Sequence, residues 1–485
     1  MNALQRLLSN SILAFIANTV AKVSGSILFI MIGRQIGPAE AGVFNLGVTY
    51  YTILLGLSTL GLDELLIREV APRREKSNQY LNNYLLIRLT SSILVYVGLL
   101  LFLQFNLPYS EETKSVLRIM SLAIFPESVF SLCQSYFIAH ERQAVPTLAA
   151  FVNAVIRLGL GVFLLQNGAG AVTIAWVIPI STLLSLLAFP IPILGLTRRI
   201  PQSVSSRFDL RFVYNQLLLT PSFLVIHLFS IVDYQTDTFM ISIMLSEEAI
   251  GWYGAAQTIL LGFWVIPRAI RSALYPLMAT YYVHAPDKLD ILYEKAFQYS
   301  LIFSLPMVVG VFLLAEEIIF LVFGPSFAPA VPVLKWSIWG VVFSFLNVPN
   351  ARLMLLNNQQ RTLSWLTGIS TLTNVGLNIL LIPRLGIVGA AIARLFASFV
   401  LFLTIYLYVR VRIGPDARPW QPLPRAALAV SLMAVTVFFL REMQLIWSVT
   451  GGVVVFILSS FVFGVIPAQD WTYWRSLLRK VDFTK

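Results

Sequence analysis

The feature that most constrains this chain is a long succession of apolar segments, each long enough to cross a membrane as a helix. About 20 consecutive apolar residues span the hydrocarbon core of a bilayer, because each helical residue advances about 1.5 Å. Of the 485 residues, 58% are apolar and only 12% are charged. A soluble protein of this length needs more charge to cover its surface. The sequence therefore predicts a membrane protein.

The apolar segments are predicted to be helices, because a backbone in contact with lipid must satisfy its own hydrogen bonds. Apolar residues come in blocks and do not alternate, which argues against a membrane β-barrel. We therefore expect an all-α, polytopic fold with fourteen transmembrane helices. Their expected ranges are roughly 8–32, 41–66, 84–105, 116–138, 145–166, 171–194, 212–244, 249–282, 297–323, 328–356, 362–382, 386–409, 424–441 and 446–466.

The basic residues between these helices predict the orientation. The N-terminus, every second connection and the C-terminal tail carry most of the Lys and Arg residues, whereas the alternate connections carry only Arg34, Lys114, Arg384 and Arg441. Cytoplasmic connections are the basic ones. Both termini are therefore expected in the cytoplasm, with the chain in the cytoplasmic (inner) membrane. The net charge of +11 is then mostly a topology signal, and nucleic acid is not an expected partner.

A short polar turn occurs twice in the chain. "RQIGPAEAGVF" from Arg34 has a counterpart in "LSEEAIGWYGA" from Leu245, with Gly42 aligned to Gly251. "FVNAVIRLGLGVFLL" in the fifth expected helix likewise matches "LTNVGLNILLIPRLG" in the eleventh. Six helices are thus repeated, and because six is even, both copies enter the membrane from the same side. The predicted domains are two parallel-repeat six-helix bundles, 1–197 and 198–412, and an additional helix pair with a cytoplasmic tail, 413–485.

Four motifs give the chain a family resemblance. They are "RQIGPAEAGVF" followed by "GLDELLIREVAPRRE", and "EEAIGWYGAAQTILLGFWVIPRAIRSALYPLMATYY" followed by "LIPRLGIVGAAIA". With these motifs the chain resembles the polysaccharide-repeat-unit (O-antigen/exopolysaccharide) flippases of the multidrug/oligosaccharidyl-lipid/polysaccharide exporter superfamily. The resemblance implies two bundles around a central cavity that opens alternately to each side. It also implies an undecaprenyl-diphosphate-linked oligosaccharide as the cargo.

Ionisable residues at membrane depth usually face a bundle interior or water. Lys22 lies near the middle of the first helix, Asn18 precedes it by one turn, and a polar stripe on the second helix begins at Asn45. We interpret these residues as substrate-binding groups on the wall of a wet cavity. The alternative is that Lys22 snorkels to the interface or pairs with a carboxylate.

Other basic residues are candidates for the same role. Arg157, with Asn153 one turn away, is near the middle of the fifth helix; its alternative role is that of a static partner for a buried carboxylate or for carbonyl groups. Arg268 and Arg271 stand one turn apart towards the cytoplasmic end of the eighth helix, where guanidinium forks match phosphate oxygens. Snorkelling to headgroups is the alternative for this pair. Arg88 is interpreted as an interface anchor.

Two carboxylates on the seventh helix are candidates for ion coupling. Asp233 and Asp237 are four residues apart and so share a helix face. Such groups bind Na⁺ or exchange protons in transporters, or they neutralise a nearby cation and fix the fold. The family resemblance also implies an aspartate where Asp237 lies. No cofactor is expected apart from the coupling ion, Na⁺ or H⁺. A metal site built from cysteines is excluded because Cys133 is the only cysteine.

The leading hypothesis is a flippase that works by alternating access. Because no Gly-rich ATP-binding motif is present, its driving force is expected to be an ion gradient or the consumption of the product outside. Its expected partners are the lipid-linked oligosaccharide, membrane lipids and the polysaccharide polymerase and export machinery. The alternatives are a cation-coupled multidrug or metabolite exporter, a lipid II flippase and a membrane-embedded glycan polymerase or transferase. The last is an enzyme and needs a sizeable outward catalytic domain, which the short connections do not offer.

Overall fold

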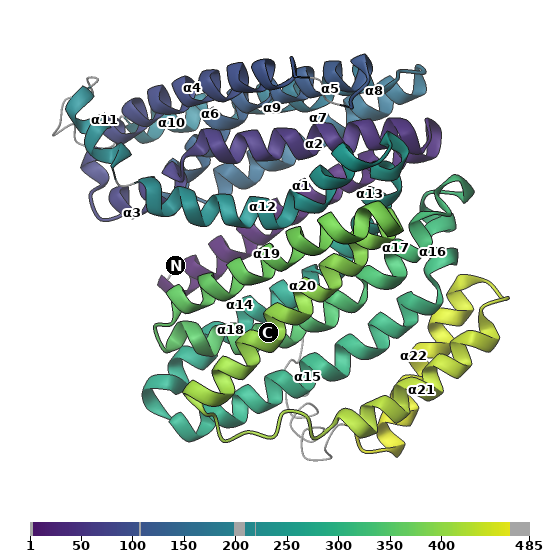
Figure 1. Ribbon diagram of the computed structural model, residues 1–485. Coiled ribbons are helices and arrows are strands. Elements are labelled where there is room, and N and C mark those ends of the chain that lie inside the picture. The colour runs from purple at the N-terminus through teal and green to yellow at the C-terminus, as the bar shows by residue number, and fades with distance from the viewer. Residues whose placement is uncertain (1–2, 106–107, 198–208, 219, 466–485) are drawn as a thin grey trace, which may run out of the picture. The chain divides into compact units, whose positions relative to one another are not determined.

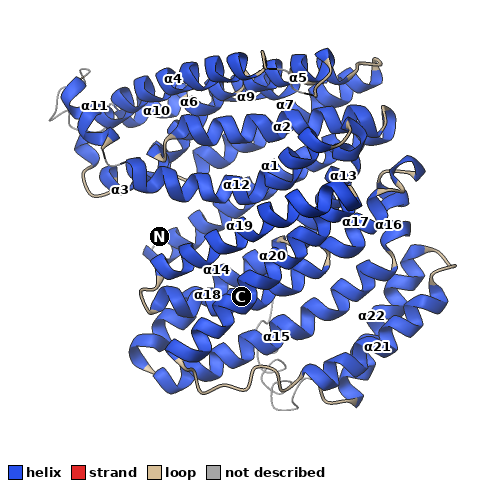
Figure 2. Ribbon diagram, viewed as in Figure 1, coloured by secondary structure: helices blue, strands red, loops and turns tan. Residues whose placement is uncertain are grey.

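The all-α prediction is confirmed in the computed structural model, which describes residues 3–105, 108–197, 209–218 and 220–465. These residues form helices joined by turns and contain no strand (Figure 2). Among them, 12 helical segments are long and apolar enough to cross a membrane. The chain is therefore a multi-pass membrane protein. The longer count of fourteen stays a prediction, although α1 and α12 occupy the positions of the other two expected helices.

The chain forms two compact units, residues 1–254 and 255–485. The first contains α1 (Ala3–Gln35), α2 (Pro38–Thr59), α3 (Leu62–Val70), η1 (Arg74–Lys76), α4 (Ser77–Phe102), α5 (Glu111–Ser121), α6 (Ile124–Ala139), α7 (Ala144–Gln166), α8 (Ala171–Ile174), α9 (Val177–Ser185), η2 (Leu186–Ala188), α10 (Pro190–Thr197), α11 (Leu210–Leu217), α12 (Thr220–Met244) and the start of α13 (Glu247–Phe263). The predicted boundaries at 197 and 412 came from the sequence repeat and remain a prediction.

The second unit contains the rest of α13 and the following helices. These are α14 (Val265–His284), α15 (Pro286–Leu313), α16 (Ala315–Val322), η3 (Pro325–Phe327), α17 (Ala330–Ser337), α18 (Trp339–Leu356), α19 (Gln360–Leu385), α20 (Ile387–Tyr408), the π-helical η4 (Val409–Ile413), α21 (Leu423–Leu440) and α22 (Leu445–Val462). Within this unit α21 and α22 pair side by side and pack on α15 (Figure 1).

Several expected helices are interrupted, and proline explains where. Proline cannot donate a backbone hydrogen bond, and its ring clashes with the carbonyl four residues earlier. The expected fourth helix breaks between α5 and α6, just before Pro126, and the eighth breaks between α13 and α14, just before Pro267. Each proline is the third residue of the new helix, where a missing N–H is harmless. In contrast, Pro276, Pro306 and Pro349 lie inside continuous helices.

The two copies of the repeated turn meet inside the first unit. A Cβ atom on Gly42 of α2 would collide with the carbonyl oxygen of Glu247, and one on Gly251 of α13 would collide with that of Pro38. The contact is reciprocal, since each carbonyl lies four residues before the glycine of its own copy. Only residues without a side chain allow two helix backbones to approach so closely. The doubled turn therefore forms a helix crossing.

Carboxylates hold the helix ends around this crossing. Glu247, in the first turn of α13, accepts hydrogen bonds from the Ser110 hydroxyl at 2.7 Å and from the Thr113 hydroxyl. Glu40, in the first turn of α2, accepts one from the backbone N–H of Ala171 at 2.6 Å. The Tyr109 hydroxyl joins α2 to α12 through Tyr50 and Ser242. The bond from Ala171 satisfies an N–H in the first turn of α8, and the others join side chains of neighbouring helices.

Candidate functional site

Three arginines gather in the second unit. Arg268 and Arg271 extend from α14, and Arg352 extends from α18, which packs directly on α14. Arg271 is close enough to Arg352 and to Arg268 to be repelled by both. The guanidinium of Arg352 lies over the ring of Tyr275, 5.2 Å from its centroid. We call Arg268, Arg271 and Arg352 the arginine cluster.

The arginine cluster has no acidic partner in the part of the chain that the structure describes. The five ion pairs recorded there all involve other residues. The Nε of Arg352 is buried and has no hydrogen-bond partner among the described atoms, whereas Arg268 and Arg271 are exposed. A guanidinium stays charged in a protein, so the cluster cannot relieve its repulsion by losing a proton. An anion bound there would relieve it.

Two members of the arginine cluster, Arg268 and Arg271, are predictable from the sequence, and the third, Arg352, is not. Arg268 and Arg271 are neighbours because they are one helical turn apart. Arg352 joins them only through the packing of α18 against α14, which no spacing in the sequence reveals. A weaker signal was present, since Arg352 is the only charged residue of α18.

The predicted residues of the first two helices lie in the first unit. Lys22 is exposed on α1, and Asn45 is partly buried on α2, where it approaches the backbone of Gly254. The side chain of Asn18 lies outside the described residues. The role of these three residues in substrate binding stays a prediction.

Arg157 belongs to a polar network between α2, α6, α7 and α9. It interacts electrostatically with the carboxylate of Glu127, which also accepts hydrogen bonds from the side chains of Tyr51 and Thr182. The amide of Asn153 donates to the Thr182 hydroxyl at 3.4 Å and to that of Ser185 at 3.3 Å. These contacts fit the alternative considered for Arg157, a static partner of a buried carboxylate. The sequence analysis missed Glu127, which follows Pro126 in an apolar segment.

Arg88 forms a second buried pair in the first unit, and its interpretation as an interface anchor is wrong. Its side chain is fully buried, with one guanidinium nitrogen 2.6 Å from a carboxylate oxygen of Asp63. Another nitrogen donates to the Ser131 hydroxyl at 2.6 Å, and the Ser135 hydroxyl donates to Asp63 at 2.8 Å. Helices α3, α4 and α6 pack against one another and bring these groups together.

The two predicted ion-coupling aspartates differ in their surroundings. Asp237 is 3% exposed on α12 and accepts a hydrogen bond from the Tyr253 hydroxyl at 2.7 Å. Asp233 is partly buried one turn earlier on the same helix. A buried carboxylate with a phenol donor can hold either a proton or a cation, so their coupling role stays a prediction.

The sequence of this chain is similar to a known protein family and to a known flippase. A family model described as "Polysaccharide biosynthesis protein" matches residues 7–282. A probable low-salt glycan biosynthesis flippase, Agl15 of Haloferax volcanii, is 23% identical over 388 residues, which are 79% of this chain and 79% of that protein.

Two solved structures have a similar fold. The lipid II flippase MurJ in an inward closed conformation superimposes with a TM-score of 0.76 at 16% identity, over 92% of this chain and 98% of that one. An inward-facing multidrug resistance transporter of the MATE family, in the MOP superfamily, gives a TM-score of 0.66 at 15% identity, over 83% and 98%. At these identities the likeness concerns the fold alone.

Proposed function

We propose that this chain, which belongs to the family of polysaccharide biosynthesis proteins, is a flippase that carries a lipid-linked glycan across the membrane. The similarity to the Agl15 flippase over four fifths of both chains supports this function. The MurJ-like and MATE-like fold is that of a transporter. The chain is therefore a transport protein, and the enzymatic alternative is set aside.

The observation that carries this proposal is the unpaired arginine cluster. A lipid-linked oligosaccharide has an anionic diphosphate between its lipid tail and its sugars, and this group does not cross hydrocarbon unaided. Arginine is costly within a membrane segment, and ionisable residues retained there usually have a function. Guanidinium groups bind phosphate oxygens in a bidentate manner. Arg268, Arg271 and Arg352 are thus proposed to bind the diphosphate.

The finer details of the mechanism are proposals that extend this one. The cargo is an undecaprenyl-diphosphate-linked repeat unit, moved by alternating access in the cytoplasmic membrane, with both termini in the cytoplasm. Polysaccharide polymerase and export proteins take up the product outside. Na⁺ or H⁺ coupling is assigned to Asp237 with Asp233, supported by the burial of Asp237 and its bond from Tyr253.

The remaining predicted binding residues are divided between two roles. Lys22, with Asn18 and Asn45, is proposed to contact the polar part of the cargo, because Lys22 is exposed on its helix. Arg157 and Asn153 are proposed to hold the first unit together, because Glu127 supplies the opposite charge that Arg157 needs.

A flipping assay tests the proposed function. The full chain is reconstituted in liposomes with a fluorescent undecaprenyl-diphosphate oligosaccharide, and the fraction accessible at the outer leaflet is followed over time. The wild type should equilibrate the two leaflets, and the Arg271→Ala/Arg352→Ala double variant should flip at least a hundredfold more slowly. Arg384→Ala, which removes an exposed arginine of the second unit outside the cluster, is the control. No flipping by the wild type would refute the function.

A further inference from the structure

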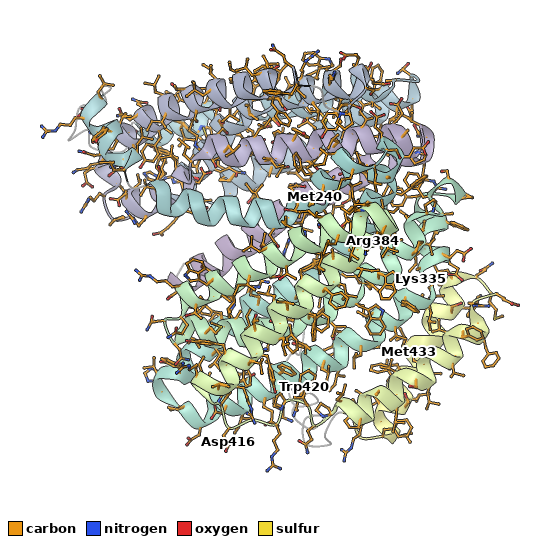
Figure 3. The ribbon with its side chains drawn as sticks, in the orientation of Figure 1. Met240, Lys335, Arg384, Asp416, Trp420 and Met433 are labelled. Atoms are coloured by element: carbon orange, nitrogen blue, oxygen red, sulfur yellow. The ribbon has the colours of Figure 1, made fainter. Side chains whose placement is uncertain are left out.

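A second charged site lies in the second unit, apart from the arginine cluster. It is a pocket of about 400 Å³ bounded by the end of α15, by α16 and α17, and by the connection between α21 and α22. Figure 3 labels Lys335 on α17, which is one of its lining residues. Besides Leu313 at the end of α15, the pocket is lined by Glu316, Glu317, Phe320, Lys335, Arg441 and Glu442.

The charges around this pocket do not neutralise one another. Among the described residues, neither Lys335 nor Arg441 forms an ion pair with any carboxylate. Their cationic groups lie over aromatic rings, Lys335 5.9 Å from the Phe312 centroid and Arg441 4.3 Å from that of Phe438. One carboxylate oxygen of Glu317 is buried and has no hydrogen-bond partner among the described atoms. Carboxylates and cationic side chains thus line the same pocket without forming ion pairs with one another.

This arrangement limits the ligand chemistry. A dianion such as the cargo diphosphate would be repelled by the three glutamates, and a bare metal cation would leave Lys335 and Arg441 without a counter-charge. A group that carries both charges fits both halves of the lining: its cation can donate to Glu317, and its anion can accept from Lys335 and Arg441. Phe320 adds an apolar wall for a short aliphatic stem. A volume of this size suits a small polar ligand.

The position of the pocket in the chain indicates the source of such a group. The pocket lies at the ends of membrane-spanning helices, on the side that the basic connections predict to be extracytoplasmic. Lipid headgroups occupy this level of a membrane. We propose that the pocket binds the phosphoethanolamine headgroup of a zwitterionic lipid from the outer leaflet. The ammonium of this headgroup donates to Glu317, and its phosphate accepts from Lys335 and Arg441.

The carboxylate of Glu317 provides a test that needs no variant. An ethanolamine ammonium donates hydrogen bonds, whereas a choline group has the same charge and no N–H. Binding of dihexanoyl-phosphatidylethanolamine to the purified full chain is therefore expected to be at least tenfold tighter than binding of dihexanoyl-phosphatidylcholine or dihexanoyl-phosphatidylglycerol. Equal binding of the three lipids, or none, overturns the proposal. If free O-phosphoethanolamine binds as tightly as the lipid, the lipid source is wrong.

Variants locate the site. Glu317→Gln and Lys335→Gln are each expected to weaken phosphatidylethanolamine binding about tenfold, while Asp416→Asn should leave it unchanged. Asp416 is an exposed carboxylate of the same unit, and Figure 3 shows it well away from Lys335. Unchanged binding in both pocket variants overturns the assignment. Thermal unfolding without ligand identifies a variant that has failed to fold. None of these measurements depends on glycan flipping, so the two proposals fail separately.

Discussion

The membrane-embedded arginines of the two units have opposite surroundings. In the first unit Arg88 forms an ion pair with Asp63, and Arg157 is attracted electrostatically by Glu127 without a direct ion pair, so each positive charge has a negative group near it on a neighbouring helix. In the second unit the members of the arginine cluster face one another. Paired charges hold helices together, whereas unpaired like charges destabilise a fold unless a ligand neutralises them. The difference separates arginines that maintain the structure from arginines that bind cargo.

The largest expected effect concerns the buried pair of the first unit. Replacing Arg88 by Leu leaves the Asp63 carboxylate without its partner, which should lower the free energy of unfolding by about 3–5 kcal/mol. The measurement is thermal or SDS-induced unfolding of the purified protein. The Arg88→Leu/Asp63→Leu double variant should recover most of the loss. If the single variant unfolds like the wild type, the pair does not stabilise the first unit.

Substitutions in the arginine cluster should slow flipping and leave the stability of the protein almost unchanged. Replacing Arg352 by Ala removes a charge-assisted hydrogen bond to the diphosphate, worth about 1.5–3 kcal/mol, so flipping should slow by roughly tenfold to a hundredfold. Unfolding should change little, because repulsion within the cluster is relieved. Arg352→Lys should restore flipping only in part, since an ammonium lacks the planar fork. If an Arg352 variant loses stability but keeps its flipping rate, Arg352 maintains the structure and does not bind cargo.

A smaller effect is expected for the second pair of the first unit. Glu127→Gln and Arg157→Gln should each destabilise the protein, and the double variant should lose less than the sum of the two. The expected coupling is about 1–2 kcal/mol, within the range for residues of one network. Unfolding of the two single variants and the double variant measures it. If the losses of unfolding free energy are additive and only Arg157→Gln flips more slowly, Arg157 binds cargo and does not pair with Glu127.

The smallest expected effect is a pH dependence in the first unit, just beyond the membrane-spanning part of α6. Burial lowers the pKa of His140 from its ordinary value of 6.5, and Arg74 and Arg142 lower it further, against a bond to the Tyr136 carbonyl. Because the pKa of His140 is higher in the unfolded chain, the unfolded chain binds a proton at His140 more readily below pH 6.5. The contribution of neutral His140 to the stability of the folded protein is therefore fully present above pH 6.5 and is lost as the pH falls. Between pH 7.5 and pH 5.5, His140 should change the free energy of unfolding by less than about 1 kcal/mol. His140→Gln should reduce that difference; an unchanged difference would exclude His140.

The sequence predicted what depends on short-range patterns. Apolar segment length predicts the helices, and spacing by one helical turn predicts that Arg268 and Arg271 are neighbours. The repeated turn in the sequence aligns Gly42 with Gly251, but the repeat does not indicate that the two turns are in contact.

The partners of buried charges could not be predicted in this way. Arg88 was assigned to the membrane interface because its place near a helix start is typical of an anchor, yet Asp63 reaches it through the packing of three helices. The same reason accounts for Glu127 and Arg352. Pairing across helices depends on their rotation and crossing, which a single sequence does not encode in any local spacing.

The most direct test of the contrast between the units is a binding measurement on both sets of arginines. A short-chain prenyl diphosphate is titrated into the purified wild type, the three single alanine variants of the arginine cluster and the Arg88→Leu/Asp63→Leu double variant. The account predicts at least tenfold weaker binding for Arg268→Ala, Arg271→Ala and Arg352→Ala, and wild-type affinity for the double variant. Wild-type affinity in all three cluster variants would contradict it.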